Sequence, residues 1–383
     1  MADRLASGVR GSLSGAAIGD ALGGPAEGLT PEQIRRRFGG WITGLGEVVE
    51  STAGTRIPPL RKGAGRVTDD TLLTVALTRV YVRLRRHLTA HDVADALVAE
   101  LADRPVYVPD MEMETQLVHR VFLAEKFLVL RLRYAHADPR EAGVGNMVNC
   151  GAAIYMAPVG IVNAGDPEGA YREAIDVAGA HQWSYGREAA GVMAAAVAEA
   201  LRPGATVGSI VDAALALARD GTAQALHAVT TAARESRGWE DAIPRLREAM
   251  RPFDSVGEEY RRPDPDARRP SRTQAIEELP VALGMVVASG GRWREAVLGS
   301  VNYGRDADSI AGMAGAIAGA LEGAGTIPPE WETQVSEASQ IDLAGLAEEL
   351  TAVAEEIFAA DRERWRERAA RFPPTDAGAE EPP

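Results

Sequence analysis

The stretch GAAIGDALG, residues 15–23, places a glycine at every fourth position. At the spacing of an α-helix these glycines share one face, and Gly312, Gly315 and Gly319 form a similar face in an apolar stretch near the C-terminus. A glycine costs up to about 1 kcal/mol in a helix relative to alanine. Its repeated use indicates that another backbone approaches each face closely, so we predict tightly crossed helices in the core.

Helical periodicity extends over most of the remaining chain. Alanine-rich segments with apolar residues three and four positions apart recur along the 383 residues, whereas the alternation typical of β-strands is scarce. We therefore predict an all-α fold, a compact helical bundle that forms a single domain over residues 1–372. Residues 254–272, rich in Arg, Asp and Pro, are expected to form a surface loop, and the acidic, proline-rich residues 373–383 a disordered tail.

The composition argues against several classes of function. A net charge of −14 repels the backbones of nucleic acids and anionic lipid headgroups, so neither nucleic acid nor a membrane is expected as a partner. No run reaches the roughly 20 apolar residues that a membrane-spanning helix needs. The single cysteine, Cys150, excludes an intrachain disulfide framework and suits a reducing compartment. We expect a cytoplasmic protein.

Two acidic clusters each precede an apolar helical pattern: TDDT at residues 68–71 and DADS at residues 306–309. Either cluster suits a helix start, because its oxygens accept hydrogen bonds from free backbone N–H groups. If the two helices meet, however, their carboxylates crowd together and each close pair repels by several kcal/mol. Hard oxygen donors without His or Cys favour Mg²⁺, Mn²⁺ or Ca²⁺ over Zn²⁺. We predict a site for two Mg²⁺ or Mn²⁺ ions, with two unrelated helix caps as the alternative.

These clusters and their order along the chain resemble the ADP-ribosylglycohydrolase family over about residues 11–331. The motifs that carry the resemblance are GAAIGDALG with Pro25 and Glu27, then TDDT, then Gly151-Ala152-Ala153 with Pro158, and then GRDADSIA at residues 304–311. The resemblance implies an all-α orthogonal bundle with two Mg²⁺ (or Mn²⁺) ions between the acidic clusters. The metal ligands that it implies are Thr68, Asp69, Asp70, Asp306, Asp308 and Ser309.

The resemblance also implies a reaction, the hydrolysis of an N-ribosyl bond through an oxocarbenium-like transition state. Glu27 corresponds to the family's acidic residue in the loop after the first helix, near the metals and the ribose. Glu27 or Asp308 is expected to take a proton from the attacking water. Cys150 is not expected to act as a nucleophile, because no activating histidine can be identified from the sequence.

The sequence departs from the family around the expected substrate pocket. Cys150 stands where the family customarily has asparagine, and Tyr155 where it has arginine. In the second acidic motif, Arg305 replaces a glycine, and Ala307 and Ser309 replace threonines. The family's arginine at the position of Tyr155 would bind a phosphate through two hydrogen bonds, and its absence removes that contact, while a tyrosine ring suits stacking on a base. We therefore expect a small N-ribosyl compound derived from a nucleoside or from NAD as the substrate.

The candidate substrate-binding residues follow from these motifs and their neighbours. His181 precedes a predicted helix, and we interpret it either as packing at the helix start or as part of the pocket wall. Tyr303 and Arg305 flank the acidic pair and could contact a base or a phosphate. The full set is Asn149, Cys150, Gly151, Tyr155, His181, Tyr303 and Arg305.

Two other functions stay open on the sequence. One is removal of ADP-ribose from modified protein side chains, and the other is a non-catalytic, crystallin-like structural role. Retention of Glu27 and of both acidic clusters argues against the structural role, which needs no open metal site. The sequence also leaves open whether the protein is a monomer or a homo-oligomer.

Overall fold

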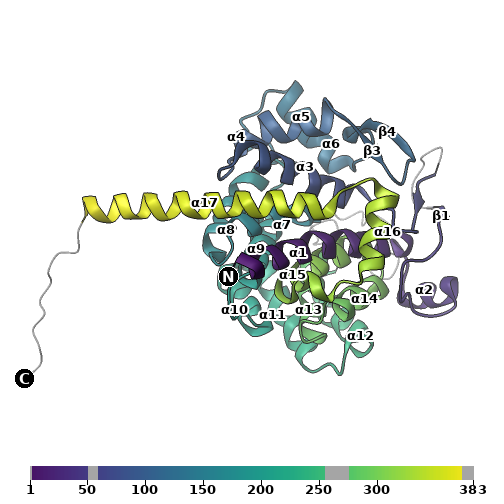
Figure 1. Ribbon diagram of the computed structural model, residues 1–383. Helices are drawn as coiled ribbons and strands as arrows, with labels where there is room; N and C mark the ends of the chain where they lie inside the picture. Colours follow the sequence, from purple (N-terminus) through teal and green to yellow (C-terminus); the bar gives the residue numbers. More distant parts are fainter. Residues whose placement is uncertain (1, 51–58, 255–275, 373–383) are drawn as a thin grey trace, which may run out of the picture.

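Helices dominate the computed structural model, which describes residues 2–50, 59–254 and 276–372 (Figure 1). Its two small sheets are antiparallel pairs, β1 (Val49–Glu50) with β2 (Arg61–Lys62) and β3 (Pro105–Val108) with β4 (Met113–Gln116). The α-helices in chain order are α1 (Ala2–Gly23), α2 (Pro31–Phe38), α3 (Asp69–Leu84), α4 (Ala90–Asp92), α5 (Val98–Ala102), α6 (Leu123–Val129), α7 (Ala157–Val162), α8 (Pro167–Gly179), α9 (Ser184–Ala200), α10 (Val207–Leu217), α11 (Asp220–Arg234), α12 (Trp239–Met250), α13 (Glu278–Ala288), α14 (Trp293–Tyr303), α15 (Ala307–Glu322), α16 (Pro329–Ser339) and α17 (Leu343–Arg371). The predicted all-α fold is confirmed.

Helices α1 and α15 pack against each other at the centre of the molecule (Figure 1). A Cβ atom added to Gly15 would lie 2.4 Å from the carbonyl oxygen of Gly315, and one added to Gly19 would lie 2.2 Å from that of Ala311. No side chain fits at such distances, so the glycines let the two backbones touch. The predicted close crossing of core helices is confirmed.

The contact between α1 and α15 also sets where the loop after α1 lies. Gly23, the last residue of α1, faces Ala307, the first residue of α15, so the end of one helix meets the start of the other. In the following loop, the backbone N–H of Gly28 donates a 2.7 Å hydrogen bond to the carbonyl oxygen of Arg305. Glu27 is thereby placed beside the second acidic cluster.

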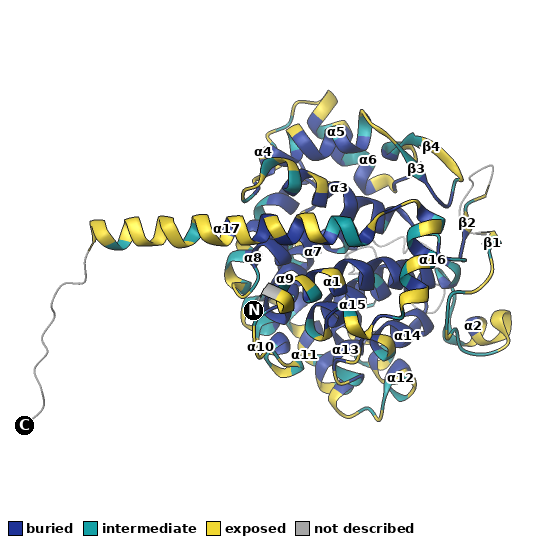
Figure 2. Ribbon diagram, in the orientation of Figure 1, coloured by how far each residue is buried: buried dark blue, intermediate teal, exposed yellow. Residues whose placement is uncertain are grey.

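The surrounding helices differ in how far they are buried (Figure 2). Helix α9 is buried without interruption over residues 189–200, because its residues there are almost all Ala, Val, Met or Gly and can face other helices on every side. Helix α17 packs against the body through its first half, and its second half extends away from it (Figure 1). Phe358 and Trp365 in that half are exposed.

Some expectations concern parts of the chain that the structure does not cover. The predicted surface loop, apart from Asp254, and the predicted tail at residues 373–383 lie outside the described residues. The single-domain boundary at residue 372 stays a prediction. Within the described ranges, no helix combines the length and the apolar character needed to cross a membrane.

Candidate active site

Helix α3 begins at the first acidic cluster, as the sequence predicts. Thr68 is the N-cap residue, and its Oγ1 accepts a hydrogen bond from the backbone N–H of Asp70. The carboxylate of Asp20, on α1 and only 1% exposed, accepts hydrogen bonds from the backbone N–H groups of Thr68 (2.9 Å) and Thr71 (3.2 Å) and from the Thr71 hydroxyl. Asp20 therefore fastens the start of α3 to α1.

The two acidic clusters meet. Ser309 Oγ, in the first turn of α15, donates a hydrogen bond to Asp70 Oδ2 at 2.8 Å and lies 3.2 Å from Asp306 Oδ1. The predicted meeting of the two helix N-termini is thus present, and it joins residues from both clusters. Carboxylate and hydroxyl oxygens at this point form the hard donor set that Mg²⁺ and Mn²⁺ prefer.

Mutual repulsion among the carboxylates is the main electrostatic feature of this cluster. Burial, followed by the charges of Asp308, Asp20, Asp69 and Asp306, raises the pKa of Asp70 well above its usual value. Among the described residues, Asp308 Oδ1 is buried without a hydrogen-bond partner. Such a group gains from a bound cation, which would both neutralise charge and occupy unused oxygens.

A lysine that was not predicted from the sequence lies between Glu27 and the second acidic cluster. Lys62, on β2, donates hydrogen bonds from Nζ to Glu27 and to Asp308 Oδ2, the latter at 3.2 Å. Burial opposes its charge, but Asp308 and Glu27 outweigh burial and raise the pKa of Lys62. Burial also raises the pKa of Asp308 to about 6, although Lys62 acts against that rise. The two predicted catalytic carboxylates are therefore side by side, joined by an ammonium group.

A second buried cation, Arg120, engages Asp69. Its guanidinium lies 2.7 Å from Asp69 Oδ1 and 2.7 Å from Asp110 Oδ2, and all three side chains are largely buried. Burial opposes the charge, but the two aspartates raise the pKa of Arg120. Asp69, expected from the resemblance to bind a metal, has an arginine partner in this structure.

The segment around Cys150 borders the acidic centre. Asn149 caps a short 3-10 helix, Cys150–Tyr155, by accepting a hydrogen bond from the backbone N–H of Gly151 at 3.1 Å. Cys150 Sγ lies 3.5 Å from Asp306 Oδ2. Burial and the neighbouring Asp306 raise the pKa of Cys150 well above its usual value, so the residue remains a thiol and is unsuited to nucleophilic attack.

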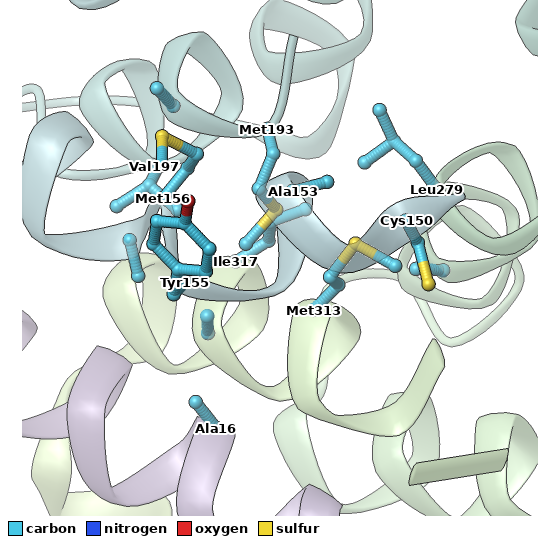
Figure 3. Close-up of a cluster of buried hydrophobic side chains, with 14 of the residues drawn as sticks. Ala16, Cys150, Ala153, Tyr155, Met156, Met193, Val197, Leu279, Met313 and Ile317 are labelled. Atoms are coloured by element: carbon cyan, nitrogen blue, oxygen red, sulfur yellow. The ribbon is translucent and has the colours of Figure 1, made fainter. Parts of the chain in front are cut away.

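Both Tyr155 and His181 have their side chains in the core, which differs from the expectation for Tyr155 and agrees with the packing interpretation of His181 rather than with a place in the pocket wall. Tyr155 is 1% and His181 0% exposed, and their rings stack with centroids 5.8 Å apart. The Tyr155 hydroxyl is 2.9 Å from His181 Nδ1, and His181 Nε2 is 3.3 Å from a carboxylate oxygen of the buried Glu125. Figure 3 shows the Tyr155 ring among other buried side chains, including Met156 and Val197. The expectation that Tyr155 stacks on a substrate base is not met, since the ring presents no open face.

Tyr303 and Arg305 are also held by carboxylates. The Tyr303 hydroxyl donates to Glu277 at 2.7 Å, and Arg305 donates to Glu277 at 2.9 Å and to Asp254 at 3.3 Å. Both residues line a cavity of about 390 Å³ that Trp41 also borders. None of the six predicted metal ligands lines this cavity. Because Arg305 is paired with Glu277 and Asp254, its guanidinium is poorly placed to make the expected contact with a phosphate.

Asp20, Lys62 and Arg120 contact the acidic clusters but were not predicted from the sequence. Asp20 had a signal, since it is the one charged residue within GAAIGDALG. Lys62 and Arg120 belong to no motif, and their partners in the acidic clusters, Asp308 and Asp69, are 246 and 51 positions away in the sequence.

The fold and the acidic clusters define a class of protein: an all-α protein in which carboxylate and hydroxyl side chains gather where the N-termini of two helices meet. The chain belongs to the ADP-ribosylglycohydrolase family, whose sequence model matches residues 1–367. It is 34% identical over 125 residues to the ADP-ribosylarginine hydrolase Tri1 of Pseudomonas putida (strain GB-1), a match that covers 33% of this chain and only 32% of Tri1.

Two further likenesses extend over nearly the whole chain. The uncharacterized protein YegU of Escherichia coli (strain K12) is 26% identical over 343 residues, which cover 87% of this chain and 93% of YegU. A solved structure described as an ADP-ribosylglycohydrolase-related protein complex has a TM-score of 0.58 at 21% identity, covering 92% of this chain and 99% of that one. At that identity the likeness establishes the fold alone.

Proposed function

We propose that this protein is a divalent-metal-dependent hydrolase that cleaves an N-ribosyl bond. The observation that carries the proposal is the contact between Ser309 and Asp70, which brings the acidic starts of α3 and α15 together. Membership of the ADP-ribosylglycohydrolase family supports the reaction class, as does the partial likeness to an ADP-ribosylarginine hydrolase.

The residues present fit a divalent cation. Asp70, Asp306 and Ser309 offer carboxylate and hydroxyl oxygens within one cluster, and Asp308 has a buried oxygen without a hydrogen-bond partner among the described residues. When bound there, the metal would supply positive charge that orients ribose hydroxyls and makes a nearby water more acidic.

The chain's own residues supply the proton acceptor. Glu27 and Asp308 lie next to each other at the junction of α1 and α15, and Lys62 holds both carboxylates in place. We assign Glu27 as the proton acceptor, with Asp308 as the alternative, because a carboxylate fixed beside the reacting water needs no reorganisation to take its proton. The surrounding carboxylates also favour the positive charge that develops on the ribose.

The substrate that we favour is a small N-ribosyl compound. Tyr155 provides no stacking surface, so this choice rests on the arginines near the acidic clusters. Arg120 and Arg305 are each engaged by two carboxylates, which disfavours their use as contacts for the diphosphate of ADP-ribose. An ADP-ribosylated protein is the second candidate, favoured by the likeness to Tri1.

A comparison of kcat/KM values decides between the two substrates. The enzyme would be assayed with Mn²⁺ on a panel of small N-ribosides and on a peptide with ADP-ribosyl-arginine. We expect the best riboside to be preferred by at least tenfold, about 1.4 kcal/mol of transition-state discrimination. A tenfold preference for the peptide would establish the second candidate instead.

A further inference from the structure

We propose that this centre takes one divalent cation, not two, and that the Lys62 ammonium group stands in the place of the second. The inference rests on the proposed metal dependence, but it concerns the number of ions and the residue that sets it. It departs from the expectation of two ions that the family resemblance gave.

Lys62 lies where a cation would otherwise fit. Glu27, Asp306 and Asp308 each offer a carboxylate oxygen, and these oxygens lie within 4.8 Å of one another, a spacing that could hold a metal ion. Lys62 Nζ donates to two of the three, Glu27 and Asp308, and the lysine side chain is only 4% exposed. A Mg²⁺ ion needs its oxygen ligands at about 2.0–2.1 Å. An ion between the same oxygens would therefore overlap the ammonium group and be repelled by its charge.

The backbone holds Lys62 in this position. Its strand β2 pairs with β1, and the neighbouring Arg61 N–H donates a 2.8 Å hydrogen bond to the carbonyl oxygen of Asp110. Gly24 leaves room for the lysine stem, since a Cβ there would lie 3.3 Å from Lys62 Cδ. Lys62 is therefore not a mobile surface side chain that a second ion could easily displace.

The amino-acid usage points the same way. Of the 41 lysines and arginines in the chain, only Lys62 and Lys126 are lysines, and all the others are arginines. An ammonium group is a compact point charge, closer to a metal ion in size and shape than the planar guanidinium of arginine. The oxygens of Asp70, Asp306 and Ser309 form the group to which we assign the single ion.

The test counts ions on the full-length protein. Isothermal titration with MnCl₂ should give one Mn²⁺ per wild-type chain, and electron paramagnetic resonance should show an isolated ion without exchange coupling. Lys62→Met removes the ammonium and keeps an unbranched side chain, so it should bind two Mn²⁺ with an exchange-coupled signal. Lys126→Met applies the same change to the only other lysine and should stay at one ion, as should the charge-conserving Lys62→Arg.

The outcomes separate the inference from the proposed function. Two Mn²⁺ ions on the wild type, or only one on folded Lys62→Met, would overturn the role of Lys62 and leave the proposed hydrolase intact. Absence of Mn²⁺ binding to the wild type would overturn the metal dependence itself. Circular dichroism checks folding, and Lys62→Gln replaces Lys62→Met if the latter does not fold. The wild-type count decides the inference even if neither variant folds.

Discussion

Ser309 and Asp70 are 239 positions apart in the chain, and the Ser309 hydroxyl donates a 2.8 Å hydrogen bond to the Asp70 carboxylate. Helix α1 makes this contact possible in two ways. Its glycine face holds α15 against it, and its Asp20 carboxylate holds the first turn of α3. The candidate active site therefore depends on α1, although no residue of α1 itself is assigned a role in the chemistry and Glu27 lies in the loop after that helix.

The crossing of α1 and α15 predicts a sharp difference between two glycines of α15. Gly319→Ala would bring a Cβ to 2.0 Å from the carbonyl oxygen of Gly11, so the free energy of unfolding should fall by about 1–3 kcal/mol. At Gly312 the nearest atom, the carbonyl oxygen of Ala16, is 3.6 Å away, so Gly312→Ala should be neutral or stabilise by up to about 1 kcal/mol. Denaturant titration measures both, and equal effects would contradict the close crossing.

Asp20 is expected to be structural rather than catalytic. Asp20→Ala leaves the backbone N–H groups of Thr68 and Thr71 without their acceptor and should lower the free energy of unfolding on the order of 3 kcal/mol. Asp20→Asn retains an acceptor oxygen and should cost less. Thermal melts of the metal-free variants provide the comparison. If the alanine variant were as stable as the wild type, Asp20 would not anchor α3.

Asp70 is expected to behave in the opposite way. Its pKa is raised by burial and by neighbouring aspartates, so its charge destabilises the metal-free protein at neutral pH. Asp70→Asn should leave metal-free stability unchanged or higher, while Mn²⁺ affinity falls at least tenfold, about 1.4 kcal/mol. Melting in EDTA and Mn²⁺ titration measure the two effects. The exposed Asp95→Asn is the control, and a similar loss of affinity there would remove the assignment of Asp70.

His87 predicts a pH dependence of stability away from the active site. Its Nδ1 is 2.5 Å from Glu173 and its Nε2 3.0 Å from Asp361 on α17, and the hydrogen bond to Glu173 raises the pKa of His87 to about 9. A raised pKa gives stability that is complete below about pH 6.5 and is lost as the pH rises through 9, about 1 kcal/mol after solvent screening.

The change at His87 can be isolated by substitution. His87→Gln should remove the pH-dependent part of the unfolding free energy between pH 6.5 and 9, whereas the exposed His91→Gln should keep it. Denaturant titrations at several pH values in this window measure the difference. A wild-type profile that the His87 substitution does not change would show that this contact adds nothing to stability.

Local patterns in the sequence predicted a large part of this architecture. The glycines of residues 15–23, and Gly315 and Gly319 on α15, are explained by the pattern itself, because a closely packed backbone leaves no room for a Cβ there, whereas Gly312 has room for one. The acidic clusters likewise mark helix starts through capping chemistry, and Thr68 does cap α3. Both signals are contained within one helix or one turn.

Contacts between distant residues could not be predicted in the same way. Lys62 meets Asp308 across 246 positions, and no spacing rule relates a residue on a two-residue strand to a helix start. Tyr155 shows a different limit, because a substitution within a family motif gives the residue type but not the direction of its side chain. Its ring stacks on His181 in the core.

Metal dependence of N-ribosyl hydrolysis tests the central claim most directly. The wild-type enzyme would be treated with EDTA, dialysed, and assayed for release of ribose or ADP-ribose from small N-ribosides and from ADP-ribosyl-arginine peptide, before and after Mn²⁺ is restored. We predict no measurable release without metal and recovery of turnover with Mn²⁺ on at least one substrate. Turnover that persists without metal would contradict the account, as would the absence of release from every substrate in the presence of Mn²⁺.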